Sequence, residues 1–259
     1  MKHTFFKYQG TGNDFVMIDN RQDNFDKSNT KLIAHLCDRH FGIGADGFIL
    51  LENDEHTDFK MVYFNSDGNE SSMCGNGGRC IMHFAHYLGV INNEATFMAI
   101  DGIHNAKIID DEVHLQMQDV SDIKNNDHFV FLDTGSPHHV ETCGNVSSLN
   151  VKNEGSRIRY SDLYKDEGSN INFVEKIDTT NFIVRTYERG VEDETLSCGT
   201  GVTAVALAMK YIGETEKNFL NINTKGGNLS VSFNETDGSF NDIWLIGPAT
   251  QVYKGEIEW

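Results

Sequence analysis

One short motif occurs twice in this chain of 259 residues, and the repetition limits the possible fold more than any other feature. The first copy is Cys74-Gly75-Asn76-Gly77 and the second is Cys198-Gly199-Thr200-Gly201, an offset of 124, the difference between 198 and 74. Both copies follow a strand-like run and open a helix-like run. Other residues keep this offset, namely the pairs Tyr87 and Tyr211, Gly89 and Gly213, Gly102 and Gly226, and Gly44 and Gly168. The sequence therefore predicts a duplicated unit whose halves each supply one thiol.

The chain length agrees with two domains of about 120 residues, each large enough to bury its own core. Residues 119–127 are polar and aperiodic, so we interpret them as the linker, with an N-terminal domain over residues 1–118. In each half the apolar pattern predicts many strands and one main helix, entered from the cysteine motif. This combination is an α+β fold of two pseudo-symmetric domains, each a strand-rich layer around a central helix. The glycine spacing does not match a dinucleotide-binding fingerprint.

The apolar periodicity places the individual elements. A first helix is expected from a cap at Asn29-Thr30 to about His40, and the two main helices are expected to end at Gly89 and Gly213. Cys37 and Cys80 lie on apolar helical faces and are interpreted as core residues. The charged segment 155–168 is interpreted as mobile. Strands are expected at 5–9, 15–19, 48–51, 59–64, 95–100, 105–109, 113–117, 129–132, 169–174, 182–187, 220–223, 229–233, 243–246 and 251–255.

Composition excludes several classes of function. A formal net charge of −18 argues against nucleic acid and anionic membranes as partners, because both need a basic face. The sequence has no run of about 18 apolar residues, the length that a helix needs to span a bilayer. Its first residues lack the apolar stretch of a signal peptide. The cysteines number five, an odd count that suits free thiols in a reducing compartment, so we expect a cytoplasmic protein. Their spacing does not form a zinc site, and we expect no metal.

A cysteine that directly precedes a helix meets the positive end of the helix dipole and several free backbone N–H groups. These groups shift the thiol pKa from about 8.5 toward neutrality, so a thiolate forms near pH 7. They also bind a carboxylate, or the oxyanion formed when the carbon beside it loses a proton. Two such thiols predict a cleft in which one thiolate removes a proton and the other thiol delivers one, as inversion of a stereocentre requires. Either cysteine alone is more simply a packed helix cap, but the pair favours function.

At these motifs the chain resembles the diaminopimelate epimerases, which are cofactor-independent racemases with two catalytic cysteines. The resemblance covers nearly the whole chain, and it is most specific where both cysteine motifs occur together with Tyr187-Glu188-Arg189-Gly190. It also includes Gly12-Asn13-Asp14-Phe15-Val16, Gly42-Ile43-Gly44 and Phe64-Asn65-Ser66-Asp67-Gly68.

The resemblance implies two similar α+β domains with the active site in the cleft between them. It implies that a C-terminal strand, at about 249–259, returns to the first domain, which leaves residues 119–248 to the second. The implied activity is the interconversion of LL- and meso-2,6-diaminopimelate in bacterial lysine and peptidoglycan precursor synthesis. The implied enzyme is an isomerase that uses no cofactor and acts as a homodimer on a small amino-acid substrate.

The resemblance also assigns roles to residues. Cys74 and Cys198 are the acid/base pair, with His138 tuning Cys74 and Glu188 tuning Cys198. From position alone, His138 is an exposed loop residue. The N–H groups of Gly75-Asn76 and Gly199-Thr200 hold the reacting α-carboxylate, as the helix-dipole argument also predicts. Arg189 suits a distal carboxylate, which a guanidinium binds in bidentate fashion. The substrate-binding set is Asn13, Asn65, Gly75, Asn76, Asn170, Glu188, Arg189, Gly199 and Thr200.

Two departures concern the distal part of the substrate. Many members have Asn-Pro-His where this chain has Ser136-Pro137-His138, and many have Gln where it has Gly47. Ser136 can still donate a hydrogen bond, whereas Gly47 supplies no side chain.

Three alternatives follow from these residues. One is a racemase of the same fold for another amino acid, such as histidine or hydroxyproline, although Asn65, Asn170 and Arg189 favour diaminopimelate. A phenazine-type isomerase and a non-catalytic binding protein are the other two. Cys74 and Cys198, both present, argue against them.

Overall fold

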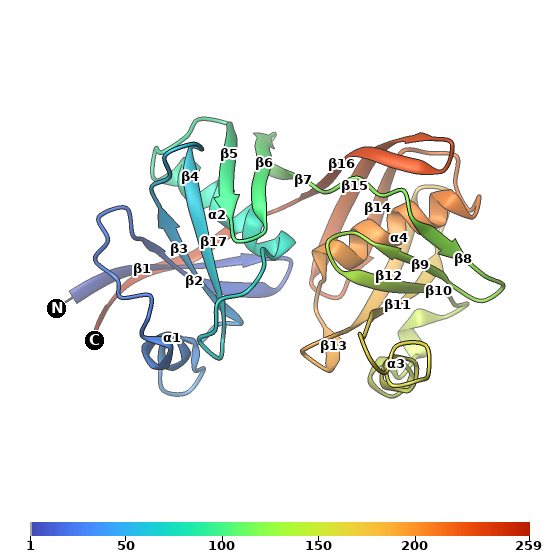
Figure 1. Ribbon diagram of the computed structural model, residues 1–259, viewed down its shortest axis with the longest axis horizontal. Coiled ribbons are helices and arrows are strands. Elements are labelled where there is room, and N and C mark those ends of the chain that lie inside the picture. The colour runs from blue at the N-terminus through green and yellow to red at the C-terminus, as the bar shows by residue number, and fades with distance from the viewer. Residues whose placement is uncertain (1) are drawn as a thin grey trace. The chain divides into compact units, whose positions relative to one another are not determined.

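A computed structural model describes residues 2–259 (Figure 1). The chain forms two compact units, the first made of Met1–Leu115 with Gly247–Trp259 and the second of Gln116–Ile246. Each unit is a strand-rich layer with one long helix, so the α+β fold expected from the sequence is confirmed. In both units that helix follows directly on a copy of the cysteine motif.

The first unit begins with an antiparallel hairpin of β1 (Lys2–Gly10) and β2 (Asn13–Asp19), whose turn places Thr11 and Gly12 at positive φ. Parallel and antiparallel pairs then alternate, because β3 joins β2 and β5 joins β4 in parallel. The last strand, β17 (Thr250–Glu258), pairs antiparallel with β1. The remaining elements are α1 (Thr30–Cys37), β3 (Gly47–Glu52), β4 (Phe59–Asn65), α2 (Gly75–Tyr87), β5 (Glu94–Ala99), β6 (Gly102–Ile109) and β7 (Glu112–Gln116).

Helix α2 lies tightly against the sheet of its unit because its first turn is rich in glycine. A Cβ on Gly77 would lie 3.1 Å from Met61 and 3.2 Å from Ile49, so only glycine allows this approach without displacing side chains. Further along, Cys80 and Phe84 are fully buried. Burial raises the pKa of the Cys80 thiol to about 12, which agrees with the core role expected from its helical position.

The second unit is built around α4 (Gly199–Tyr211), which lies among the strands of its own unit in Figure 1. Most of α4 is apolar and buried, from Gly199 to Met209. Gly155 of α3 lies so close to β12 that a Cβ there would meet Tyr187 at 2.3 Å. The elements are β8 (Ile123–Asn125), β9 (Val130–Asp133), β10 (Pro137–Thr142), a 3-10 turn (Val146–Ser148), α3 (Val151–Arg159), β11 (Asn170–Lys176), β12 (Asn181–Glu188), β13 (Asp193–Thr195), β14 (Phe219–Thr224), β15 (Gly227–Thr236) and β16 (Ser239–Gly247).

Three expectations about local structure are wrong. Helix α1 ends at Cys37 instead of about His40, because Asp38 is extended and its carboxylate accepts the N–H groups of His40 and Phe41. The supposed linker contains β8 and a bridge from Val120 to Phe240. Residues 155–159 of the charged segment interpreted as mobile belong instead to α3, a regular helix whose cap at Asn150 accepts the N–H of Asn153.

Among the described residues, no helix is long and apolar enough to cross a membrane. The same part of the chain holds no group of three or more His, Cys, Asp or Glu side chains that could bind a metal ion.

Candidate active site

Both motif cysteines occupy the N-cap of their helix. Cys74 has φ −97° and ψ 129° before α2, and Cys198 has φ −121° and ψ 112° before α4. Neither thiol makes a side-chain cap to its own helix. The N–H groups in the first turn of a helix have no partner further back in that helix, so each thiol lies beside a helix N-terminus, a place where proteins bind anions. Cys74 is half-buried and Cys198 is buried.

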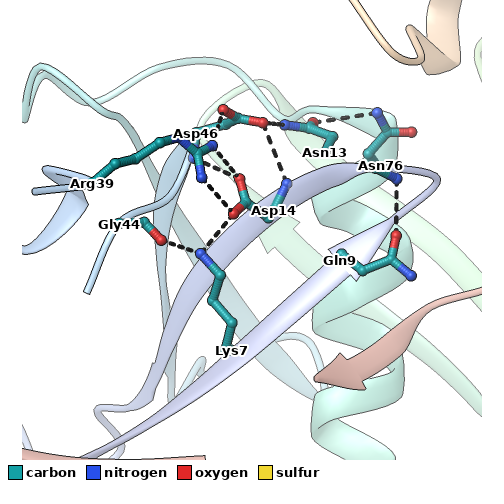
Figure 2. Close-up of polar contacts among 9 residues, drawn as sticks. Lys7, Gln9, Asn13, Asp14, Arg39, Gly44, Asp46 and Asn76 are labelled. Atoms are coloured by element: carbon teal, nitrogen blue, oxygen red, sulfur yellow. Dashed lines mark hydrogen bonds and ion pairs between the residues drawn. The ribbon is translucent and has the colours of Figure 1, made fainter. Parts of the chain in front are cut away.

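In the first unit, Asn13 lies in a network of polar side chains (Figure 2). Its Oδ1 accepts from Cys74 Sγ at 3.5 Å and from Asn76 Nδ2 at 3.2 Å. Its Nδ2 donates to Asp46 Oδ2 at 2.9 Å. Because a carboxylate only accepts, Asp46 fixes which end of the Asn13 amide faces the cysteine.

Asp46 belongs to a group of charged side chains, visible at the left of Figure 2. Arg39 bridges Asp46 and Asp14, each at 2.7 Å, and Lys7 contacts Asp14 at 2.7 Å and the carbonyl of Gly44. Burial alone would raise the pKa of Asp14, but hydrogen bonds from Arg39 and Lys7 outweigh it and lower that pKa to about 2. Asp14 is therefore ionised at neutral pH and anchors the start of β2.

Gly47 and Asn65 face each other across the β3–β4 pair. A Cβ on Gly47 would lie 2.5 Å from the ring of Tyr63 and 2.9 Å from the carbonyl oxygen of Phe64. The Tyr63 ring thus fills the space that a side chain at position 47 would need. The hydroxyl of Tyr63, on the neighbouring strand, would lie 3.1 Å from the same Cβ, so an aromatic hydroxyl occupies this place.

In the second unit, Cys198 Sγ lies 3.4 Å from the hydroxyl of Thr200. The carbonyl of Thr200 accepts from the Thr134 hydroxyl at 2.8 Å. Thr134 is buried in the loop between β9 and β10, so that loop fixes the start of α4.

Two predicted substrate-binding residues of the second unit come together. Asn170 Nδ2 donates to the Ser136 hydroxyl at 2.9 Å, and Asn170 Oδ1 accepts the backbone N–H of Arg189 at 2.9 Å. The Arg189 side chain is exposed and donates to the carbonyl of Glu167 at 3.0 Å. Ser136 therefore takes part in a polar group with Asn170 and Arg189.

His138 is fully buried in β10, not exposed in a loop, because β10 pairs with β9 and β11. Asn172 Oδ1 accepts from the Thr186 hydroxyl, so its Nδ2 faces His138 Nδ1 at 3.1 Å. Nδ1 is then the acceptor and Nε2 carries the proton, with no hydrogen-bond partner among the described residues. Burial, aided by the charge of Arg189, lowers the pKa of His138 to about 3.

The ring of His138 lies at the start of α4. A Cβ on Gly201 would be 3.3 Å from His138 Cε1 and 3.4 Å from Cys198 Cβ. Within the second unit, His138 is thus a neighbour of the Cys198 helix. Its predicted role toward Cys74, which belongs to the other unit, stays a prediction.

The predicted site residues divide between the two units. The first unit holds Asn13, Asn65, Cys74, Gly75 and Asn76, and the second holds His138, Asn170, Glu188, Arg189, Cys198, Gly199 and Thr200.

The sequence did not predict the roles of Asn172 and Asp46. The only signal for Asn172 was its alternation with Asn170 along one strand. Asp46 lies beside Asn13 only because the chain folds back, so no local pattern indicates it.

A family model and similar curated proteins indicate the same family for this chain. A model of the diaminopimelate epimerase family matches residues 5–122 and 130–252. The diaminopimelate epimerase of Flavobacterium psychrophilum is 60% identical over 253 residues, which cover 97% of this chain and 99% of that protein. The diaminopimelate epimerase of Chlorobaculum tepidum is 42% identical over 259 residues, which cover 96% and 98%.

Solved structures show the same fold at low identity. A PhzF-family phenazine biosynthesis protein of Bacillus anthracis has a TM-score of 0.77 and 14% identity over 100% of both chains. A hydroxyproline epimerase from Agrobacterium vitis, crystallised with trans-4-hydroxy-L-proline, has a TM-score of 0.69 and 14% identity, with coverage of 99% and 92%. At this identity the likeness concerns the fold alone.

Proposed function

This chain belongs to the diaminopimelate epimerase family, and on that premise we propose that Cys74 and Cys198 carry out its reaction as a thiolate and thiol pair. The chain is an isomerase that interconverts LL- and meso-2,6-diaminopimelate. The observation that carries the proposal is the duplicated N-cap: each unit presents one cysteine at the start of its central helix.

The reaction is a proton exchange at one carbon. The thiolate of one cysteine takes the proton as the Cα–H bond breaks, and the electron pair moves toward the α-carboxylate. The N–H groups of Gly75, Asn76, Gly199 and Thr200 stabilise the charge that develops on that carboxylate. The other thiol then protonates Cα from the opposite face and becomes the thiolate. The two cysteines exchange roles when the reaction runs in reverse.

The remaining predicted residues hold the substrate or tune the thiols. Asn13, Asn65, Asn170 and Glu188 bind its polar groups, and Arg189 binds the distal carboxylate as a charged fork. His138 and Glu188 tune the two thiols. Because its lowered pKa keeps His138 neutral at pH 7, it acts as a hydrogen-bond donor through Nε2, not as a proton source.

A second candidate is a racemase of the same fold for another amino acid. Two observations favour it: Tyr63 fills the position beside Gly47, and Ser136 stands where an asparagine is common in the family. Both positions concern the distal end of the substrate. This second function therefore differs from the first in its substrate and shares the proton exchange at Cα between two thiols.

We also propose that the enzyme works in the cytoplasm as a homodimer. The proposal follows from the family and from the odd number of cysteines. Light scattering of the purified protein should give twice the chain mass of 29.1 kDa. A mass of one chain at micromolar concentration would contradict the dimer.

The decisive experiment is proton NMR of LL-diaminopimelate with the protein in D2O and no added cofactor. Deuterium should enter Cα while the meso isomer grows, and both should be lost in Cys74→Ser and in Cys198→Ser. Cys143→Ser is the matched control, because Cys143 lies outside both motifs and should keep wild-type activity. Epimerisation that survives either motif substitution would reject the two-thiol mechanism. Exchange with another amino acid, and none with diaminopimelate, would favour the second candidate.

A further inference from the structure

Helix α2 carries a charged residue that the proposed mechanism does not use. Arg79 lies one turn after Cys74 and is fully buried, with 0% of its surface exposed. An isolated charge in a protein interior is strongly destabilising unless it is paired or hydrogen-bonded. The hydrogen-bond partners of Arg79 therefore indicate the role of this buried charge.

Each hydrogen bond that Arg79 donates within the described chain goes to a neutral oxygen. Nη2 donates to Asn76 Oδ1 at 3.1 Å and to the Thr11 hydroxyl at 3.2 Å. Nη1 donates to the carbonyl of Gly75 at 3.3 Å, and Nε to that of Pro248 at 3.5 Å. Among residues 2–259 no carboxylate forms an ion pair with it. The site therefore holds a net positive charge of the protein's own.

The surrounding backbone is shaped to enclose this guanidinium. Strand β1 crosses α2 at Gly10, where a Cβ would lie 3.3 Å from Arg79 Nη2 and 3.1 Å from the carbonyl oxygen of Asn76. Burial lowers the pKa of Arg79, and the nearby Cys80 and Cys74 act in the opposite direction. An arginine stays protonated in spite of such burial.

The guanidinium connects to the thiol through two amides. Arg79 binds Asn76 Oδ1, which turns Asn76 Nδ2 toward Asn13 Oδ1 at 3.2 Å, and Asn13 Oδ1 contacts Cys74 Sγ. Arg79 also binds the carbonyl of Gly75, the residue next to Cys74. Hydrogen bonds thus link the positive charge to the residues that flank the Cys74 thiol.

The duplication supplies an internal comparison. The offset of 124 relates Arg79 to Thr203, the difference between 203 and 79. Thr203 is also fully buried, and its hydroxyl donates to the carbonyl of Gly199 at 3.1 Å, as Arg79 does to that of Gly75. The two helices therefore share the contact at this position, but only α2 has a charge there.

We propose that Arg79 is a positioning residue that supplies the Cys74 half-site with a buried positive charge and favours the thiolate of Cys74. The inference rests on the proposed function in taking Cys74 as an acid/base group. The Asn13 contact opposes this effect, because Oδ1 accepts from the protonated thiol at 3.5 Å. The attraction between a full positive charge and a thiolate acts over a longer range than a neutral contact at 3.5 Å, so we expect the charge of the buried Arg79 to outweigh it.

Other charges near Cys74 do not replace Arg79. Cys80 is neutral at pH 7 because burial raises the pKa of its thiol to about 12. Asp46 lies behind Asn13 and is paired with Arg39. Asp14 is likewise paired with Arg39 and Lys7, so that group holds charges of both signs.

The test is the pH dependence of alkylation of Cys74 by iodoacetamide in the full-length protein, with each cysteine followed separately by peptide mass spectrometry. Only the thiolate reacts, so the midpoint reports thiolate formation. Arg79→Met keeps the length and removes the charge. It should move the Cys74 midpoint up by about one pH unit and slow alkylation at pH 7 by about fivefold for a midpoint near 7, and by up to about tenfold for a higher one. The Cys198 midpoint should not move.

Two further variants make the result specific. Arg79→Lys keeps the charge, and its Cys74 midpoint should stay within about half a pH unit of wild type. Thr203→Val, the matched change on α4, removes a hydroxyl without altering charge and should leave both midpoints unchanged. Circular dichroism and thermal melting check that each variant folds. If Arg79→Met does not fold, Arg79→Lys decides alone, and a shift of about one unit or more in that variant overturns the proposal.

An unchanged Cys74 midpoint in folded Arg79→Met, or equal shifts at Cys74 and Cys198, also overturns the proposal. Alkylation reports the thiolate whether or not turnover occurs. Failure of the proposed function would appear separately, as epimerisation that survives Cys74→Ser.

Discussion

Asn13 donates its Nδ2–H to Asp46 Oδ2 at 2.9 Å, and this contact leaves the carbonyl end of the amide to face Cys74. A terminal amide can present either an acceptor or a donor, and a thiolate is stabilised by a donor and a thiol by an acceptor. Asp46 therefore determines that the Cys74 thiol meets a hydrogen-bond acceptor, although the carboxylate of Asp46 acts only through Asn13.

Asp46→Asn should weaken this control, because an amide at position 46 can donate as well as accept. Asn13 would then populate both orientations, and we expect kcat/KM for epimerisation to fall about tenfold, equivalent to roughly 1.4 kcal/mol. Steady-state kinetics with LL-diaminopimelate measures the effect. Asp162→Asn is the control, since Asp162 is an exposed carboxylate in the other unit and its loss should leave kcat/KM unchanged. Equal rates for Asp46→Asn and wild type would show that the amide orientation does not matter.

Much of this site could be predicted because the chemistry lies in local sequence. The duplicated motif predicts both N-cap cysteines, since the helix begins at the next residue in each copy. The glycines after each helix end it as expected, with Gly89 and Gly213 at positive φ. These features depend on backbone geometry over a few residues, which residue type encodes directly.

What the sequence did not predict depends on contacts between distant residues. The burial of His138 arises from β10, whose polar His138-His139 pair gives no apolar alternation to indicate a strand. Helix α3 has only Val151, Gly155 and Ile158 on its buried face, too few apolar residues to outweigh its charges. Arg79 was visible in the motif, yet its lack of a carboxylate partner is a fact of the fold.

The packing of Gly47 against Tyr63 predicts a loss of stability on adding a side chain. Gly47→Ala places a methyl group 2.5 Å from the ring and 2.9 Å from the carbonyl oxygen of Phe64, so we expect about 1–3 kcal/mol of destabilisation in urea unfolding. Tyr63→Ala should recover part of that loss in the double variant, because the ring is one of the two obstacles. Gly144→Ala, with open space at its Cβ, is the control and should change stability by less than about 0.5 kcal/mol. A neutral Gly47→Ala would refute the packing argument.

The buried, neutral His138 predicts a defined pH dependence of stability. Its pKa is lowered from 6.5 to about 3 in the folded chain, so at pH 7 the residue is neutral both folded and unfolded. As pH falls below 6.5 the unfolded chain binds the proton and the folded chain does not. Stability should therefore decrease by up to about 1.4 kcal/mol per pH unit toward pH 3.

His138→Gln removes this contribution, and urea unfolding between pH 7 and pH 4.5 measures it. The variant should lose stability less steeply than wild type over that range. His56→Gln, at an exposed histidine, should keep the wild-type slope. Parallel slopes for wild type and His138→Gln would contradict a buried neutral imidazole.

The ion pair of Lys7 and Asp14 predicts an asymmetry between single and double substitutions. Lys7 is 7% exposed and contacts Asp14 at 2.7 Å. Asp14→Ala leaves the ammonium buried with only the Gly44 carbonyl as a direct partner on that side, so we expect about 3–5 kcal/mol of destabilisation. Lys7→Met with Asp14→Ala removes both charges and should be more stable than Asp14→Ala alone, because no unpaired charge remains buried.

The same pair predicts behaviour in acid. The folded pKa of Asp14 is lowered from 3.8 to about 2, so its contribution to stability is complete above pH 4 and is lost as pH falls toward 2. Urea unfolding at pH 7 and pH 3 should therefore show the gap between wild type and Asp14→Ala becoming narrower at pH 3. Lys2→Met, which removes an exposed lysine paired with Glu256, is the control and should change stability little at either pH. If the double variant is less stable than Asp14→Ala, the buried Lys7 charge is balanced without Asp14, and the ion pair does not anchor the start of β2.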